Sequence, residues 1–197
     1  MPPPPPPRAR ADLPALLSRS SIVLFGDSLT QRGFERDGWA AAVADYYGRR
    51  ADVYNRGYGG YNARWGAELA PALLPPPLPG AGRHMLVTVW FGANDAALPS
   101  ERAHVPLSEF EAHLDGVVTR AARAAHRVVV VTPPPVHGPT RLAYQRRKYG
   151  DKASGVEERT TELSAAYPPA PKSCFDRATL LVDTSRRWRR RRVAAPP

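Results

Sequence analysis

Three almost uninterrupted apolar runs restrict what this 197-residue chain can fold into. They cover Ser21 to Phe25, Met85 to Phe91 and Arg127 to Thr132, and the last run contains four consecutive valines. A strand that is apolar on both faces must be covered on both faces, which is typical of parallel sheets between two layers of helices. The runs therefore predict an α/β fold, a three-layer α/β/α sandwich built on a parallel sheet.

Weaker signals complete an alternation of strands and helices. Ala51 to Tyr54 and Thr179 to Val182 have strand character, which brings the sheet to about five strands. Because Pro and Arg dominate the end of the chain, we expect the last strand and its helix to be incomplete. Apolar residues at helical spacing predict helices over Gly38 to Tyr47, Ala63 to Leu74, Leu107 to Ala125 (capped by Ser108, with Glu111 three residues on) and Val156 to Tyr167.

Composition divides the chain into three parts. Residues 1–19 form a leader with six consecutive prolines, residues 20–167 form the folded domain, and residues 168–197 form a divergent tail rich in Pro and Arg. We expect the leader to be disordered. A plain low-complexity segment is favoured over a polyproline ligand for SH3 or WW domains, and the apolar core of a secretory signal is absent.

Charge and cysteine content exclude several classes of protein. Six arginines lie between Arg186 and Arg192, and removing their charge from the formal net charge of +10 leaves +4. That value is ordinary for a soluble enzyme, so an unstructured tail is favoured over one that contacts nucleic acid or an acidic membrane. The single Cys174 excludes an internal disulfide and a cysteine-based metal site. No apolar stretch approaches the roughly 20 residues of a membrane span, and we expect a cytoplasmic protein.

Small and polar residues follow three of the predicted strands. These segments are Gly26-Asp27-Ser28, Gly57 to Gly60, and Gly92-Ala93-Asn94-Asp95. Because active sites in parallel sheets lie beyond the carboxyl ends of the strands, we expect the three loops to meet at one edge. Together they offer a hydroxyl nucleophile, backbone N–H donors exposed by glycine and a side-chain amide, which is what acyl transfer requires.

Each loop taken alone has a simpler interpretation. Asp27 or Ser28 would serve as the N-cap of an ordinary helix, and Gly57 to Gly60 would form a turn. A dinucleotide-binding fingerprint is excluded because Asn62 stands in place of its third glycine, and no Gly-Lys-Ser/Thr follows to make a P-loop. Thr30 likewise excludes a Gly-x-Ser-x-Gly nucleophile elbow. The combination of all three loops favours the catalytic interpretation.

The same loops carry a resemblance to a known family. Gly26-Asp27-Ser28-Leu29-Thr30, the segment from Asn55 to Trp65, and Gly92-Ala93-Asn94-Asp95 are similar in order and spacing to blocks I, II and III of the GDSL/SGNH hydrolases. The second block, together with His104-Val105-Pro106-Leu107 and Thr132-Pro133-Pro134-Pro135, resembles the isoamyl-acetate-hydrolysing esterases. The resemblance covers about residues 20–167. It implies a flavodoxin-like sheet and hydrolysis of short-chain carboxylic esters such as acetates, without a metal or organic cofactor.

The resemblance also implies roles for single residues. Ser28 is expected to be the nucleophile, to form an acyl-enzyme with a small-molecule ester, and to donate its backbone N–H to the oxyanion. Gly60 is expected to add a backbone N–H and Asn94 a side-chain N–H. Three further residues are expected to support the site, the last two by bracing their loops: Asp27, Asp95 and Arg64.

One block of the family is missing from the sequence. It is an Asp-x-x-His pair near the C-terminus, which supplies the base and the carboxylate that orients it, and no histidine follows His137. His137 follows the fourth strand at the edge expected to hold Ser28, so it is the candidate substitute base. A solvated loop histidine is the competing interpretation. The other histidines are expected to brace a loop (His104), to lie at the opposite edge (His84) or to lie at the surface (His113 and His126).

Loss of the base predicts impaired catalysis. Removing the base from a catalytic triad costs on the order of 10⁶ in kcat, while the oxyanion donors and substrate binding retain about 10³ over water. We therefore expect a weak esterase. Two alternatives remain open: a catalytically inactive binding module that keeps the oxyanion pocket, and a truncated or misframed gene product.

Overall fold

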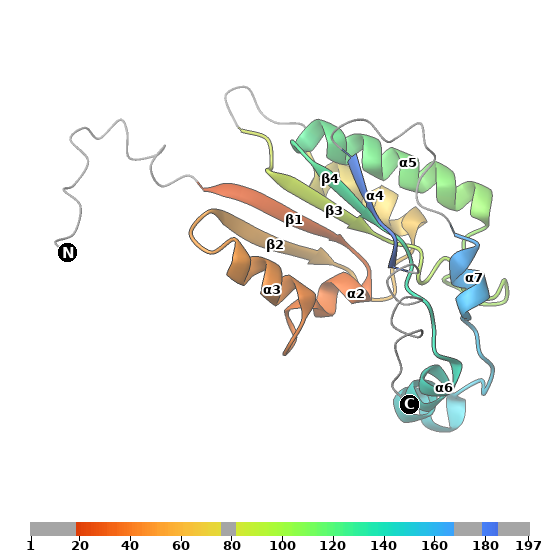
Figure 1. Ribbon diagram of the computed structural model, residues 1–197. Coiled ribbons are helices and arrows are strands. Elements are labelled where there is room, and N and C mark those ends of the chain that lie inside the picture. Colours follow the sequence, from red (N-terminus) through yellow and green to blue (C-terminus); the bar gives the residue numbers. More distant parts are fainter. Residues whose placement is uncertain (1–18, 76–81, 168–178, 185–197) are drawn as a thin grey trace, which may run out of the picture.

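The computed structural model describes residues 19–75, 82–167 and 179–184, which form an α/β fold with a single sheet (Figure 1). The sheet has the order β2-β1-β3-β4-β5, and every neighbouring pair of strands is parallel. This is the flavodoxin-like strand order, so the predicted fold class is confirmed. The strands are β1 (Ser20–Gly26), β2 (Ala51–Gly57), β3 (Leu86–Trp90), β4 (Val128–Val131) and β5 (Thr179–Val182).

Helices cover both faces of the sheet. The long helices α4 (Ala63–Leu73) and α5 (Leu107–Ala124) lie on one face, and α3 (Trp39–Tyr46) lies on the other (Figure 1). The remaining helices are short or lie beyond the carboxyl ends of the strands. They are α2 (Ser28–Gln31), η1 (Arg32–Phe34), α6 (Gly138–Tyr149), η2 (Gly150–Lys152) and α7 (Thr161–Ala165).

Two hydrophobic cores result from the alternation of side chains along the strands. On β1, Val23 and Phe25 belong to the larger core beneath α4 and α5, whereas Ile22 and Leu24 belong to the smaller core beneath α3. All four side chains are buried. β1 is thus apolar on both faces because each face is covered by its own layer of helices, as the sequence predicted.

Three predicted boundaries were wrong. The segment predicted as a helix over 156–167 is helical only in α7, where the Thr160 hydroxyl accepts a hydrogen bond from Leu163 N at 3.2 Å and fixes the later start. Strand β2 continues to Gly57 because it pairs with β1 along its whole length. Helix α5 begins at Leu107 after Pro106, so Ser108 lies inside the helix rather than at its N-cap.

Helix α6 was not predicted. Its single buried residue is Gln145, and its sequence Gly-Pro-Thr-Arg-Leu-Ala-Tyr-Gln-Arg-Arg-Lys-Tyr is mostly polar. A helix that buries polar groups has no apolar stripe, and the apolar stripe is the signal on which sequence prediction of helices depends. The helix is therefore recognised only from its tertiary contacts.

Several predictions concern residues that the structure does not describe. They are the disordered leader over residues 1–18, the tail apart from residues 179–184, Cys174 and the arginines between Arg186 and Arg192. Within the described ranges, no helix has the length and apolar character needed to cross a bilayer. The same ranges contain no group of three or more His, Cys, Asp or Glu side chains arranged to hold a metal ion.

Candidate functional site

The three loops meet where the strand order changes direction. β1 lies between β2 and β3, and Gly26 at its end is in register with Gly57 of β2 and Trp90 of β3. In sheets of this type, ligands bind in the crevice at that switch point. A Cβ at Gly57 would overlap the backbone of Gln31, so glycine at this position lets α2 lie against the end of β2. The site is thus built on three adjacent strand ends.

Asp27 and Ser28 form the start of α2. The Asp27 carboxylate accepts a hydrogen bond from Leu29 N at 2.8 Å, so Asp27 is the N-cap. Ser28 follows as the first helical residue and is half-buried. The first N–H groups of a helix have no partner within the helix, which leaves the backbone N–H of Ser28 available to a ligand. The capping interpretation therefore holds for Asp27 and is compatible with a nucleophile at Ser28.

Gly60 lies in a tight turn that follows β2. The turn is closed by a hydrogen bond from Tyr61 N to Tyr58 O at 3.1 Å, and Gly60 has a φ of +83°. That left-handed conformation is adopted readily by glycine and rarely by other residues. Gly60 is exposed, and nothing lies within 4 Å of the position a Cβ would take. The backbone conformation, rather than lack of space, accounts for glycine here.

Asn94 links the three loops. Its Nδ2 donates a hydrogen bond to Tyr61 O at 2.7 Å, next to Gly60 in the chain. The same nitrogen lies 3.5 Å from Asp27 Oδ2, which is too long for a strong hydrogen bond. Asn94 is buried. An amide nitrogen carries two hydrogens. One is donated to Tyr61, and within the part of the chain that the structure describes the other has only the long contact with Asp27.

Asp95 ties the third loop to the second. Its Oδ1 accepts from Ala63 N at 2.8 Å, at the start of α4, and its Oδ2 accepts from Gly92 N at 3.1 Å. Asp95 is fully buried. Burial raises its pKa to about 6, against the opposing effects of the backbone N–H groups of Ala63, Asp95 and Gly92 and of the Arg64 charge. These bonds hold the turn that carries Asn94 against the helix that follows Gly60.

Asp27 is a second buried carboxyl group at this edge. Burial raises its pKa to about 7, and the nearby charge of Asp95 acts in the same direction. The Leu29 N–H and the Arg159 guanidinium act in the opposite direction. An acid with this pKa is half protonated near neutral pH, so the site holds less negative charge than its two aspartates would imply.

The sequence prediction missed Arg159. Its side chain is 16% exposed, and three of its nitrogens donate to different acceptors. Nε donates to Ala93 O at 2.9 Å, Nη2 to Asn94 Oδ1 at 3.1 Å and Nη1 to Glu158 Oε1 at 2.7 Å. Because the sequence predicted a helix over 156–167, Arg159 was expected on a helix face. A Glu-Arg pair ahead of a Thr cap is the signal that could have placed it in a loop instead.

Arg64 and His137 both have partners on helices. Arg64 Nη2 lies 2.5 Å from Glu109 Oε2, so its ion pair joins α4 to α5, and its charge also acts to lower the pKa of Asp95 in the third loop. His137 is exposed at the N-cap position of α6, and its Nδ1 lies 2.7 Å from Thr140 Oγ1 on its own helix. Among the described residues, the hydrogen-bond partner of its ring is Thr140 and not Ser28.

The remaining histidines lie away from the three loops or have structural contacts. His84 Nδ1 lies 2.6 Å from Ser21 Oγ near the amino end of β1, at the opposite edge of the sheet. His104 Nδ1 donates to Ala97 O at 2.8 Å within the connection between β3 and α5. His113 is half-buried on α5, and His126 is exposed just after it. The hydrogen-bond partners of the His84 and His104 rings are therefore Ser21 and Ala97, and not Ser28.

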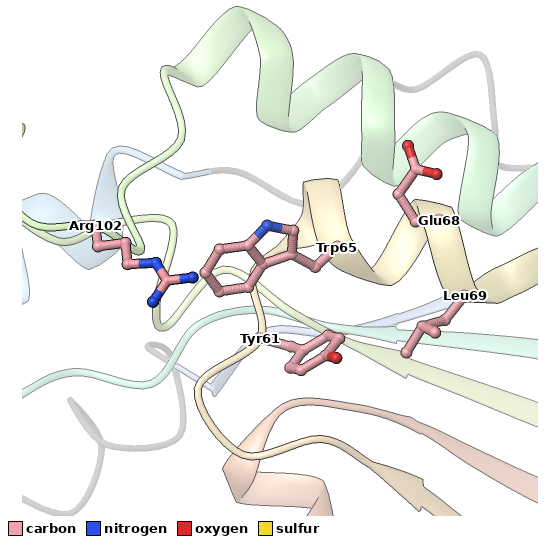
Figure 2. A pocket seen from close by; sticks show the side chains of 5 residues that line it. All are labelled: Tyr61, Trp65, Glu68, Leu69 and Arg102. Carbon is pink, nitrogen blue, oxygen red and sulfur yellow. The ribbon is translucent and has the colours of Figure 1, made fainter.

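A pocket of about 340 Å³ adjoins the second loop (Figure 2). Its walls are Tyr61, Trp65, Glu68, Leu69 and Arg102. The rings of Tyr61 and Trp65 meet edge to face at 5.6 Å, and the Arg102 guanidinium lies 5.7 Å from the centre of the Trp65 ring. Tyr61 takes part in both features, because its ring lines the pocket while its carbonyl accepts from Asn94.

Sequence comparison finds relatives of two related kinds. A model of the GDSL-like Lipase/Acylhydrolase family matches residues 24–192. GDSL esterase/lipase At5g62930 of Arabidopsis thaliana is 42% identical over 154 residues, which cover 76% of this chain and 63% of that protein. The isoamyl acetate-hydrolyzing esterase 1 homolog of Bos taurus is 44% identical over 121 residues, covering 58% of this chain and 48% of that protein. The chain spans about half to two thirds of the length of these relatives.

Solved structures with the same fold include esterases. A variant of Axe2, an acetylxylan esterase from Geobacillus stearothermophilus, superposes with a TM-score of 0.57 at 18% identity, covering 90% of this chain and 82% of that one. LAE5, an alpha/beta hydrolase enzyme from the metagenome of Lake Arreo in Spain, gives a TM-score of 0.57 at 21% identity, covering 90% and 83%. At these identities the likeness concerns the fold alone.

Proposed function

Because this chain belongs to the GDSL-like Lipase/Acylhydrolase family, we propose that it is a serine hydrolase of carboxylic esters. The observation that supports this most directly is the position of the Asn94 amide. Its Nδ2 lies 2.7 Å from the carbonyl of Tyr61, next to Gly60, and 3.5 Å from Asp27, next to Ser28. One amide thus lies between the loop of the nucleophile and the loop of the second donor.

The proposed reaction begins with attack of Ser28 Oγ on the ester carbonyl carbon. The carbonyl oxygen becomes an oxyanion and accepts hydrogen bonds from the Ser28 N–H, the Gly60 N–H and Asn94 Nδ2. Donors that are fixed before the reaction stabilise this charge without reorganising, and each contributes about 10²–10³ to kcat. Collapse of the intermediate releases the alcohol and leaves the acyl group on Ser28, from which water then removes it.

The proton of Ser28 Oγ must pass to a base as Oγ bonds to the carbonyl carbon. In the proposed reaction water accepts this proton, and the departing alkoxide takes one back from water, so the attack by Ser28 is the slow step. The sequence contains no histidine beyond His137, and the His137 ring contacts Thr140. We therefore propose a slow esterase, with the oxyanion donors as the main source of rate enhancement over water. The competing proposal is a binding module without turnover, which is supported by the contact of the exposed His137 ring with Thr140 of its own helix.

Short-chain esters such as acetates are the proposed substrates. The relative from Bos taurus is named for isoamyl acetate hydrolysis, and the second sequence block of this chain resembles that subgroup. The proposal needs neither a metal nor an organic cofactor, because the nucleophile and the three oxyanion donors all belong to the chain.

The test is hydrolysis of p-nitrophenyl acetate by the full chain beside a Ser28→Ala variant. We expect slow turnover above the rate of the variant, because only the wild-type chain can form the acyl-enzyme. Mass spectrometry of the quenched reaction should then show one acetyl group on Ser28. Equal rates for the two proteins, without acetylation, would reject the esterase and leave the binding module.

The candidate substitute base has its own test. If His137 accepts the Ser28 proton, His137→Ala should abolish the Ser28-dependent turnover, while the matched change at the exposed His126, His126→Ala, should leave it unchanged. An unaffected rate in His137→Ala would remove His137 from the mechanism.

A further inference from the structure

We infer that Arg159 is a positioning residue, which fixes the orientation of the Asn94 amide so that its NH₂ edge faces the oxyanion. The inference rests on the proposed function, in which Asn94 supplies the side-chain donor. Arg159 belongs to the segment between α6 and α7, which no part of the sequence resemblance assigns to the site. We call Arg159, with its bonds to Ala93 and Asn94, the clamp.

The two edges of an asparagine amide have similar shapes and opposite hydrogen-bonding roles. A guanidinium has five N–H groups and no acceptor, so its contact with Asn94 Oδ1 at 3.1 Å is favourable in one orientation only. Rotating the amide by half a turn would place NH₂ against the Arg159 donors and oxygen against the Tyr61 carbonyl. The orientation with Nδ2 toward Tyr61 and Asp27 is therefore the one that Arg159 selects.

Tyr61 alone holds the amide less securely. Its carbonyl belongs to the turn around the exposed Gly60, whereas Arg159 is largely buried and bonded at three points. The Nε contact with Ala93 O at 2.9 Å is to the carbonyl directly before Asn94. Arg159 thus contacts both the backbone and the side chain of the same turn, which sets the position and the rotation of the amide together.

Glu158 holds Arg159 in place. It is buried, and its Oε1 accepts from Arg159 Nη1 at 2.7 Å and from Arg141 Nε of α6 at 2.8 Å. Its second oxygen accepts from Gln145 of the same helix. A buried carboxylate shared by two guanidinium groups is well compensated in charge. The polar residues of α6, which give that helix no apolar stripe, therefore anchor the clamp.

Lysine cannot replace arginine in this arrangement. An ammonium is a point charge on a flexible stem, whereas the guanidinium presents a rigid planar fork. The acceptors Ala93 O, Asn94 Oδ1 and Glu158 Oε1 are each met by a different nitrogen of that fork. Arg159→Lys is therefore expected to restore charge without restoring orientation.

The test compares Arg159→Met with Arg141→Met. Both variants remove one guanidinium from Glu158, but only Arg159 touches Asn94, so Arg141→Met controls for the lost ion pair. At a temperature where circular dichroism shows all proteins folded, we expect Arg159→Met and Arg159→Lys to lower kcat for p-nitrophenyl acetate about 10- to 100-fold, with KM within about threefold. Arg141→Met removes one partner of Glu158 but leaves the three hydrogen bonds of Arg159 in place, so its effect on kcat should be about tenfold smaller than that of Arg159→Met.

A second measurement does not depend on turnover. In ¹⁵N-labelled protein, the two side-chain N–H signals of Asn94 are assigned by their loss in Asn94→Ala. We expect both signals to shift and to exchange with water faster in Arg159→Met and in Arg159→Lys, and to change much less in Arg141→Met, in which Arg159 still contacts Asn94. Equal effects of Arg159→Met and Arg141→Met on kcat, or unchanged Asn94 signals in Arg159→Met, would overturn the inference.

The experiments distinguish failure of the proposed esterase activity from failure of the proposed role of Arg159. If the wild-type chain shows no Ser28-dependent turnover, the proposed function fails, and the Asn94 signals alone decide whether Arg159 orients the amide. If turnover is present and the signals are insensitive to Arg159, the esterase stands and the clamp is rejected.

Discussion

Asp27 shows how one residue serves both the fold and the site. Its Oδ1 caps α2 through Leu29 N, and its Oδ2 faces Asn94 Nδ2 at 3.5 Å. Its sequence position, between the apolar end of β1 and Ser28, allowed both roles to be stated in advance. Its burial and its contact with the third loop required the fold, because Asn94 lies 67 positions further along the chain.

The raised pKa of Asp27 predicts a specific dependence of stability on pH. The pKa of Asp27 is about 7 in the folded protein, whereas its ordinary value, which we take for the unfolded chain, is 3.8. Between about pH 4 and 7 the folded state therefore binds a proton that the unfolded state has lost. Stability from this group is fully present below about pH 4 and is lost as the pH rises through 7. Above pH 7 the group contributes no further slope.

The measurement is urea unfolding of the wild type and Asp27→Asn from pH 4 to 8. Asparagine keeps an oxygen for Leu29 N but cannot titrate. We expect the stability of the wild type relative to Asp27→Asn to fall between pH 4 and 7 and then to level off. Asp95, with a pKa near 6, is present in both proteins and therefore cancels in this difference to first order. A difference that stays constant with pH would contradict the raised pKa.

At the scale of elements, two glycines in neighbouring helices differ in the space that surrounds them. Gly66 is buried in α4, and a Cβ there would lie 2.7 Å from Cζ of Phe91. Phe91 is itself buried and packs edge to face on Phe25 at 5.1 Å, so its ring has little room to move. Gly116 in α5 is exposed, and nothing lies within 4 Å of the corresponding position.

Alanine substitution should therefore act in opposite directions in the two helices. In Gly116→Ala we expect the free energy of unfolding to rise by up to about 1 kcal/mol, since alanine is the better helix former. In Gly66→Ala the same gain is outweighed by overpacking, which typically costs about 1–3 kcal/mol. Urea denaturation of both variants is the measurement. Stabilisation by Gly66→Ala would mean that α4 can move away from Phe91.

At the scale of the whole molecule, the topology assembles the site. Residues of the first, second and third loops come together because β1 lies between β2 and β3, with Gly26, Gly57 and Trp90 in register. Because all neighbouring strands are parallel, their carboxyl ends lie at a common edge of the sheet. The order of the strands, rather than any local feature of a loop, therefore determines which loops are neighbours.

The net charge of the whole chain predicts retention on a polyanion. Removing the residues after Ser185 lowers the formal net charge from +10 to +4, because six arginines are lost and no acidic residue is. We expect the shortened chain to elute from heparin at lower salt than the full chain, since such retention follows the number of cationic contacts. A full chain in which only the six arginines between Arg186 and Arg192 are changed to lysine should elute near the wild type. Equal elution of the full and shortened chains would contradict the prediction.

Prediction from sequence worked where the signal was local. The apolar runs of β1, β3 and β4 predicted their strands because a buried strand is apolar on both faces, and the Gly-rich segments predicted the loops that follow the strands. Sequence prediction failed for α6 and for the segment around Arg159. The groups that these segments bury are polar: Gln145, Glu158 and most of the Arg159 side chain. Polar burial is compensated by partners elsewhere in the chain, so it leaves no periodic pattern.

By itself the sequence determined the α/β class, the strands and the three loops that carry Ser28, Gly60 and Asn94. These features depend on short stretches of residues, whose types decide whether a strand is buried and where the chain can turn. Only the tertiary structure decided that the Asn94 amide meets Arg159, 65 positions away, and that Glu158 secures this contact through α6. The physical reason is that a hydrogen bond between distant polar groups depends on how packed elements are placed in space, and residue types alone do not encode that placement.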